Sequence, residues 1–329
     1  MLSPITGKEM ERVYEKRIWK FRGEEYEYIH TAWLCTESGE QFTTDVSDTA
    51  GYLQVTNQYR EKYGIPYTDE IIGIRRKYGI SAAKMSLILG IGVNQYRLYE
   101  QGEVPSVSNG RMIRSIMNPK VMLELVESSR NELSESEYSK IVAKVKDAIA
   151  CSDNYKLEQY EINRVFSTKR GAENGYACLS LDRLRNILLF ILERCSNVWY
   201  TKMNKLLFYA DFVSFRDRGM ALTGLSYRAI DFGPVPEKWD KVYSEFSDVS
   251  QEFSRIGDYV GTVLMSSAKP DLTLFSADEI EVLERVCERF GADTSAKISR
   301  QSHEETAWLD HITNNERIPF REAFKLKAL

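Results

Sequence analysis

The segment from Ile74 to Pro105 constrains the fold of this chain more than any other, because it alternates helix-forming residues with a glycine turn. Ser81 is a good N-cap for a first short helix, since its hydroxyl can accept a backbone N–H that has no partner within the helix. Gly90 and Gly92 follow that helix and supply a sharp turn, where a residue with a Cβ would be strained. The pattern predicts the first helix and the turn of a helix-turn-helix.

A second helix is predicted from about Val93 to Gln101, with Tyr96 and Tyr99 on its buried face at i, i+3 spacing. Its other face carries three polar residues: Asn94, Gln95 and Arg97. Asn and Gln can bond adenine edges and Arg can bond guanine, and these residues stand near the helix start that enters the major groove. The alternative is a helical hairpin in an ordinary α-domain, whose polar face is only solvated.

The charge distribution favours contact with DNA. Residues 70–120 contain eight basic and three acidic residues, a net +5 within a chain of net −4, so the remainder carries −9. A local basic module in an acidic protein suits phosphate binding. We expect Ser81, Lys84 and Arg111 to hold phosphates, while the second helix reads bases.

The composition fits a cytoplasmic globular protein. With 329 residues, 43% hydrophobic and 28% charged, the chain can form two or three domains with real cores. It has no apolar run as long as a membrane span, and its first residues, MLSPITGKEM, lack a signal-peptide core. The five cysteines are scattered and odd in number, which argues against a disulfide framework.

Residues 1–66 are predicted to form a small β-rich module. Arg12–Arg22 and Glu25–Leu34 are rich in β-branched and aromatic residues, and Gly23 and Glu24 separate them. This arrangement predicts a β-hairpin.

The segments that flank the hairpin, SPITG and CTESGE, have the outline of zinc knuckles, C-x-x-C-G, with most thiols missing. The four ligand positions would be Ser3, Thr6, Cys35 and Ser38. One thiolate and three hydroxyls cannot hold zinc tightly, because structural sites need Cys or His at every corner. We therefore expect a degenerate ribbon without metal; the alternative is two accidental glycine turns.

The middle of the chain is predicted to be helical. A helix-turn-helix domain covers residues 67–127, and Thr68 is expected to cap its first helix. Residues 128–175 form a connector, in which Ser134 and Glu137 make a capping-box pattern that opens an amphipathic helix.

Residues 176–329 form a second globular domain with a small β element. Ser180 caps one helix, another helix follows Thr201, and Ser276 and Glu279 make a second capping box. The whole chain is thus predicted to be mainly α with small β elements, an α+β fold.

The N-terminal half resembles antitoxins built from a YgiT-type zinc ribbon and an XRE-like DNA-binding domain, the MqsA type. The segments SPITG, CTESGE and SAAKMSLILGIGVNQYRLYEQGEVPS carry this resemblance. It implies a DNA-binding antitoxin whose ribbon has lost its metal ligands.

The C-terminal half resembles the Panacea, or SocA-like, domain of antitoxins. The resemblance rests on Asn204–Gly219 (NKLLFYADFVSFRDRG), Ala229–Trp239 (AIDFGPVPEKW) and Ser302–Trp308 (SHEETAW). It implies neutralisation of a toxin by direct contact. On that basis the expected toxin contacts are Tyr209, Phe232, Gly233, Pro234, Val235, His303 and Trp308.

The sequence offers little for an enzyme. His303, Glu304 and Glu305 invite a metallo-enzyme interpretation, but no second His stands four residues from a His-Glu pair, so a capping or interface role for His303 is favoured. No phosphate loop or nucleophile elbow occurs. The carboxylates Asp211, Asp217, Asp231 and Asp240 are expected to be solvated. We expect neither catalysis nor a cofactor.

Together these features predict the antitoxin of a type II toxin–antitoxin pair. Its partners would be a co-encoded protein toxin and, as a homodimer, a palindromic operator in duplex DNA that it represses. Two alternatives stay open: a free-standing transcription regulator with a sensing C-terminal domain, and an adaptor that delivers a partner to a protease. A small toxic protein encoded next to this gene would favour the antitoxin.

Overall fold

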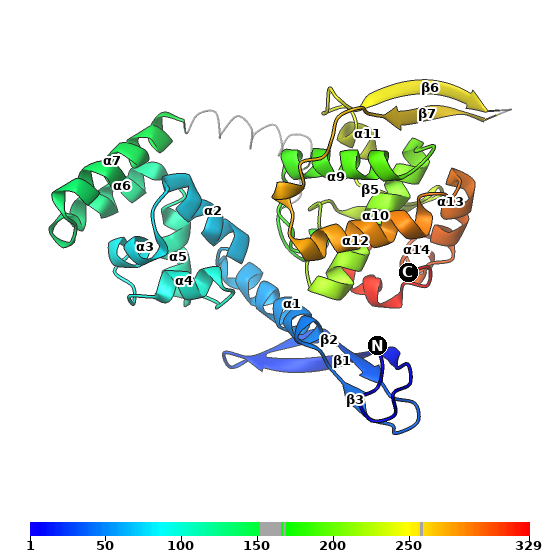
Figure 1. The fold of residues 1–329 in the computed structure, drawn as a ribbon, viewed down its shortest axis with the longest axis horizontal. Helices are drawn as coiled ribbons and strands as arrows, with labels where there is room; N and C mark the ends of the chain where they lie inside the picture. Colours follow the sequence, from blue (N-terminus) through cyan, green and yellow to red (C-terminus); the bar gives the residue numbers. More distant parts are fainter. Residues whose placement is uncertain (152–165, 167–168, 257–258) are drawn as a thin grey trace. The chain divides into compact units, whose positions relative to one another are not determined.

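The computed structural model shows a mixed α+β fold (Figure 1). It describes residues 1–151, 166, 169–256 and 259–329. Contacts divide the chain into two compact units. Unit 1 joins Met1–Val55 with Ile162–Leu329, and unit 2 is Thr56–Glu161. Among the described helices, none combines the length and the apolar character needed to cross a bilayer.

The predicted division into four domains, at 1–66, 67–127, 128–175 and 176–329, stays a prediction. The boundary between the two units falls within helix α1 (Asp45–Tyr63). Residues 152–165 and 167–168 of the predicted connector lie outside the described residues.

Unit 1 begins with the predicted β-hairpin, which the structure confirms. Strands β1 (Glu11–Phe21) and β2 (Glu24–Leu34) pair antiparallel along their whole length. The turn consists of Arg22 and Gly23, with φ values of 51° and 88°. A two-residue turn that follows the twist of the strands needs positive φ at both central residues. The predicted turn at Gly23 and Glu24 was therefore one residue late.

Helix α10 lies at the centre of the C-terminal part of unit 1. Every residue of α10 from Lys202 to Arg216 is buried, and the helix contacts α12, α13, β5 and η4 (Figure 1). The helices of this part are α9 (Leu181–Arg194), α10 (Tyr200–Arg218), α11 (Trp239–Val242), α12 (Ala277–Phe290), α13 (Ser295–His303) and α14 (Thr306–Leu309). The 3-10 turns are η2 (Ala172–Asn174), η3 (Leu272–Leu274) and η4 (Phe320–Lys325).

The strands of unit 1 form small antiparallel sheets. Besides β1 and β2 they are β3 (Gln41–Phe42), β4 (Tyr227–Ile230), β5 (Gly233–Pro236), β6 (Ser250–Ile256) and β7 (Tyr259–Met265). β3 pairs with β2, β4 with β5, and β6 with β7. For residues 176–329 the sequence predicted only one small β element, so the β6–β7 hairpin was not predicted. β7 is fixed to the preceding helices by the Leu264 N–H, which donates to the Val198 carbonyl at 2.8 Å.

Helix starts follow side-chain caps in most of the predicted places. Ser180 accepts from a backbone N–H at the start of α9, and Ser276 with Glu279 forms the predicted capping box of α12. The start of α10 differs by two residues: the helix was predicted to follow Thr201, but Trp199 is the N-cap and Tyr200 is the first helical residue.

The N-terminal hairpin packs against the C-terminal part within unit 1. Arg12 of β1 forms an ion pair with Asp217 of α10 at 2.7 Å, and the rings of Tyr14 and Phe324 meet edge to face at 5.5 Å. At the end of α10, Gly219 adopts a left-handed φ of 72°. Residues far apart in the sequence therefore share one core.

Unit 2 is a helical bundle. After the C-terminal part of α1 it contains α2 (Thr68–Tyr78), α3 (Ala82–Ile88), α4 (Gln95–Glu100), α5 (Val107–Ser115), α6 (Pro119–Ser128), the turn η1 (Arg130–Glu132) and α7 (Glu135–Ala150). Tyr78, Met85, Tyr96 and Val145 are fully buried members of one hydrophobic cluster. The predicted capping box of Ser134 with Glu137 opens α7, whose apolar face joins this cluster.

Thr68 is not the cap of α2, which corrects the prediction. The N-cap position belongs to Tyr67, and Thr68 is the first helical residue. Glu70 satisfies the start of the helix by accepting the Tyr67 N–H at 2.8 Å. A carboxylate in the first turn also suits the positive end of the helix dipole.

Gly219 is a position at which we expect alanine to be poorly tolerated. A Cβ there would lie 2.7 Å from the Ala50 carbonyl oxygen of α1, and φ is positive. We expect Gly219→Ala to lower the free energy of unfolding by at least about 2 kcal/mol, measured by urea denaturation. Gly73→Ala is the control, because nothing lies within 4 Å of that Cβ. An equal effect of both substitutions would contradict the close approach.

Candidate functional site

The two short helices of unit 2 form around the predicted turn. Ser81 caps α3 by accepting the Lys84 N–H at 3.3 Å. Gly90 has a φ of 62°, a left-handed conformation that favours glycine, whereas Gly92 has no positive φ, so only Gly90 fits the predicted role. The following helix α4 starts at Gln95, two residues later than predicted.

The inner face of α4 is held by two tyrosines. The Tyr96 hydroxyl donates to the Ile71 carbonyl at 2.8 Å, and the Tyr96 N–H donates to the Ser86 hydroxyl at 3.0 Å. The Tyr99 hydroxyl accepts from the Asn109 amide at 2.8 Å. These bonds fix the rotation of α4 about its axis and therefore fix which residues it exposes.

The outer face leaves only some of the predicted DNA contacts accessible. Asn94, Arg97 and Arg111 are exposed, and so is Ser81 beside its capping bond. Gln95 is half-buried and donates to the Glu103 carboxylate at 3.0 Å.

The Lys84 ammonium, predicted to hold a phosphate, instead pairs with Glu137 at 2.9 Å. Hydrogen bonds from Lys84 and then from Ser134 lower the pKa of Glu137 to about 2. Lys84 is thus engaged with a carboxylate that stays ionised at neutral pH.

The two predicted knuckles of the N-terminal module have the same backbone geometry. In the first, the Gly7 N–H donates to the Ser3 carbonyl at 2.9 Å; in the second, the Gly39 N–H donates to the Cys35 carbonyl at 2.8 Å. Both glycines adopt left-handed φ values, 70° and 73°. The two turns thus share one backbone conformation, and the ribbon interpretation stays a prediction.

The four positions predicted from the knuckle pattern come together around one thiol. The Thr6 hydroxyl lies 3.5 Å from the Cys35 sulfur. Hydrogen bonds from Ser3, then Ser38, then Thr6 lower the pKa of Cys35 to about 6. In the described part of the chain no group of three or more His, Cys, Asp or Glu side chains could hold a metal ion.

In unit 1, a buried lysine holds the loop that carries the Gly-Pro-Val-Pro segment. The Lys205 ammonium on α10 donates to the Phe232 carbonyl at 2.6 Å and to the Pro234 carbonyl at 2.9 Å. Gly233 between them has a φ of 95°, and a Cβ there would lie 2.7 Å from the ammonium nitrogen. Only glycine allows this approach. Burial lowers the pKa of Lys205 to about 7.

A histidine and a tryptophan cover the other side of this loop. The rings of His303 and Trp308 stack with centroids 4.4 Å apart, and the Trp308 indole donates to the Ile230 carbonyl at 2.8 Å. The Nε2 atom of His303 is buried and has no hydrogen-bond partner of normal geometry among the described residues. Burial, and then the Lys205 charge, lower the pKa of His303. The imidazole is therefore neutral at pH 7.

These contacts present one aromatic side chain to solvent. Phe232 is 74% exposed at the tip of the loop, although the residues after it, Gly233, Pro234 and Val235, are buried. His303 and Trp308 are half-buried. Of the expected toxin contacts, Phe232 is thus the one with a large accessible surface.

Tyr209 does not fit the predicted role of a direct toxin contact. Its side chain is fully buried, its ring stacks on Phe290 at 4.4 Å, and its hydroxyl donates to Glu305 at 3.2 Å. Glu305 also accepts the N–H groups of Lys327 and Ala328 at 2.8 and 3.0 Å. Tyr209 therefore packs in the core, and Glu305 connects it by hydrogen bonds to the backbone of Lys327 and Ala328.

Phe232 borders a groove with aromatic walls. A cavity of about 220 Å³ lies between Phe232, Lys205 and Trp239. A larger cavity of about 740 Å³ adjoins it and shares Tyr200 and Trp239. Half-exposed aromatic side chains in such a groove are typical of protein contact sites.

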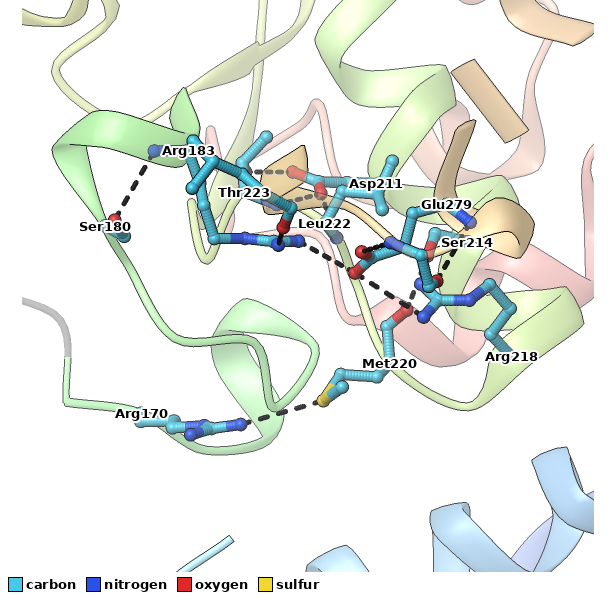
Figure 2. Close-up of polar contacts among 12 residues, drawn as sticks. Arg170, Ser180, Arg183, Asp211, Ser214, Arg218, Met220, Leu222, Thr223 and Glu279 are labelled. Atoms are coloured by element: carbon cyan, nitrogen blue, oxygen red, sulfur yellow. Dashed lines mark hydrogen bonds and ion pairs between the residues drawn. The ribbon is translucent and has the colours of Figure 1, made fainter. Parts of the chain in front are cut away.

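Asp211 is buried, which corrects the expectation that it is solvated. Its carboxylate accepts the N–H groups of Leu222 and Thr223 at 2.7 and 2.8 Å (Figure 2). It also accepts the Tyr227 hydroxyl at 2.6 Å. Burial raises the pKa of Asp211 against the effect of these bonds. Asp211 thereby fixes the turn that precedes β4.

The other three carboxylates that were expected to be solvated differ from one another. Asp217 is largely buried and paired with arginines, contrary to expectation, whereas Asp231 and Asp240 are exposed.

The sequence interpretation missed Lys205, Asp211 and Glu305 as structural centres. One signal was available for the first two, because a lysine and an aspartate interrupt the buried part of the helix between Met203 and Phe212, which has no exposed face for them to occupy. Charged residues at such positions are buried only with hydrogen-bond partners.

The buried Lys205 ammonium should give unit 1 a specific dependence on pH. Its pKa is about 7 in the folded chain and 10.5 ordinarily, so between these values only the unfolded chain binds the proton. Stability should therefore rise with pH across that interval, by up to about 1.4 kcal/mol per pH unit from this group. Urea denaturation from pH 7 to 9.5 should show a flatter profile for Lys205→Met than for the wild type. Parallel profiles would contradict the assignment.

The comparisons with known proteins concern the C-terminal part. A family model described as the antitoxin SocA-like, Panacea domain matches residues 203–309. No curated protein and no solved structure matches the chain. The matched segment contains Lys205, Asp211, the Phe232 loop, His303 and Glu305. The part of this protein from residue 203 to residue 309 is therefore similar to an antitoxin domain.

Proposed function

We propose that this protein is the antitoxin of a toxin–antitoxin pair and that it neutralises a co-encoded protein toxin by binding it without catalysis. The match of residues 203–309 to an antitoxin domain supports the toxin–antitoxin role. The toxin would bind at the Phe232 loop. The proposal includes a cytoplasmic location, a homodimer and repression of the protein's own operon.

The main support for the proposed toxin-binding site is the exposed side chain of Phe232 on a loop that hydrogen bonds hold in place. Lys205 donates to the Phe232 carbonyl and to the Pro234 carbonyl, and the Phe232 side chain is exposed beside an aromatic groove. Because the backbone is already fixed, little entropy is lost when a partner covers the ring. An aromatic anchor of this kind is typical of the few residues that dominate a protein interface.

We expect Phe232→Ala to abolish neutralisation in cells that express the adjacent toxin, and to weaken the purified complex by at least about 30-fold. The side chain can be removed without loss of the Lys205 bonds, which involve the backbone. Phe253→Ala is the matched control, since Phe253 is an exposed phenylalanine (81%) on the β6–β7 hairpin. Full neutralisation by Phe232→Ala would contradict the proposed site.

The proposed operator contact rests on the accessible face of α4. Asn94 and Arg97 are exposed there, the two tyrosines fix the helix on its other side, and the surrounding segment has a net charge of +5. Arg97 can bond a guanine edge and Asn94 an adenine edge. In the proposal Arg111 contributes a phosphate contact, while Gln95 and Lys84 would have to leave their carboxylate partners first.

Arg97→Ala should weaken binding to the promoter sharply, by about ten- to a hundredfold, and leave toxin neutralisation intact. Lys146→Ala removes the same charge from an exposed position of α7 and serves as control. Binding to promoter DNA and to a scrambled duplex is compared at two salt concentrations. Loss of neutralisation in Arg97→Ala, or equal promoter binding by both variants, would contradict the proposed roles.

A further inference from the structure

An apolar side chain stands exposed at the start of helix α4, where packing gives no reason for it. Val93 lies just before the helix and is 81% exposed, as much as any other large apolar side chain in the described part of the chain. A single exposed apolar residue has no significance by itself. Its neighbours give Val93 significance, because Asn94 and Arg97 are also exposed and belong to the proposed operator contact.

The turn that carries Val93 is held on both sides by one residue of α3. The Ser86 carbonyl accepts the Ile91 N–H at 3.0 Å, and the Ser86 hydroxyl accepts the Tyr96 N–H at 3.0 Å. The backbone before and after Val93 is therefore fixed. Little conformational entropy is lost when a partner covers a side chain that is presented in this way.

The polar side chains beside Val93 are available to a partner. Asn94 occupies the N-cap position of α4, but its side chain makes no capping hydrogen bond, although Asn is a favoured N-cap residue. Arg97 is exposed and forms no ion pair with any residue that the structure describes. An amide, a guanidinium group and an isopropyl group thus face solvent next to one another.

The charge of the surroundings favours DNA over an apolar protein surface as the partner of this group. Residues 70–120 carry a net charge of +5, and a basic surface of this kind suits the phosphates of a duplex. The floor of the major groove offers acceptors for Arg and a donor with an acceptor for Asn. The apolar group that base edges present there is the C5-methyl group of thymine.

We propose that Val93 recognises thymine in the operator by packing against its C5-methyl group in the major groove. The inference rests on the proposed operator binding by α4 and adds one base to it. Asn94 and Arg97 would hydrogen-bond purine edges, whereas Val93 would favour a neighbouring base pair that contains thymine. The three side chains would then recognise three chemically different features of the groove.

The test compares the promoter duplex with a duplex in which deoxyuridine replaces every thymidine. This exchange removes the C5-methyl groups and leaves the hydrogen-bonding groups of the bases in place. We expect the full wild-type chain to bind the deoxyuridine duplex about three- to tenfold more weakly, as the loss of one or two buried methyl contacts implies. Fluorescence anisotropy at constant salt concentration measures both affinities.

Val93→Ser should bind the unmodified promoter about three- to tenfold more weakly than the wild type. It should also no longer distinguish the two duplexes, because the same contact cannot be lost twice. Val46→Ser is the matched control, since Val46 is an exposed valine (65%) of α1 within unit 1. This control should keep both the wild-type affinity and the full effect of deoxyuridine.

The outcomes separate this inference from the proposed function. Equal wild-type affinity for both duplexes, with promoter DNA still preferred over a scrambled duplex, would overturn the role of Val93 and leave operator binding in place. A full deoxyuridine effect in Val93→Ser would overturn it too, since another residue would then contact the methyl group. No preference of the wild type for promoter DNA would overturn both proposals. Lost toxin neutralisation by Val93→Ser with unchanged promoter binding would make Val93 a protein contact and overturn the inference.

Discussion

The C-terminal part of this protein is organised by charged side chains inside helix α10, each of which must be satisfied by a group brought from elsewhere. Lys205 donates hydrogen bonds to two carbonyls of the Phe232 loop. Asp211 accepts hydrogen bonds from two backbone N–H groups and a tyrosine hydroxyl. A buried ion without such partners would cost several kcal/mol, about as much as the net stability of a domain (~5–15 kcal/mol). The loops therefore have little freedom to rearrange while the helix stays in the core.

This constraint explains why particular residue types stand at several positions of the segment that matches the family model, residues 203–309. Gly233 is required because a Cβ would collide with the Lys205 ammonium, and Trp308 is required where its indole meets the Ile230 carbonyl. Most of these residues shape and brace the loop, and Phe232 is the one that the loop exposes.

The sequence predicted the helices and strands better than it predicted what individual side chains contact. Periodicity and capping patterns placed the hairpin, the two short helices of unit 2 and the helices that follow Ser180 and Ser276, because these depend on local propensity. The partners of Tyr209, Asp211 and Asp217 could not be seen, since other parts of the chain supply them. The pairing of Lys84 with Glu137 was missed for the same reason, as the partner lies on a helix assigned to a connector. The β6–β7 hairpin was also missed.

The packing of β1 against the end of α10 affects how this protein can be divided for experiments. Arg12 and Tyr14 cover Asp217 and Phe324, and Gly219 lies against the backbone of α1. A fragment that starts near residue 176 would lose all three coverings and uncover the apolar ring of Phe324. Such a fragment would be prone to self-association for reasons unrelated to toxin or DNA. Excision of the inserted helical bundle, with retention of both flanking stretches, would respect the folding unit better than truncation from either end.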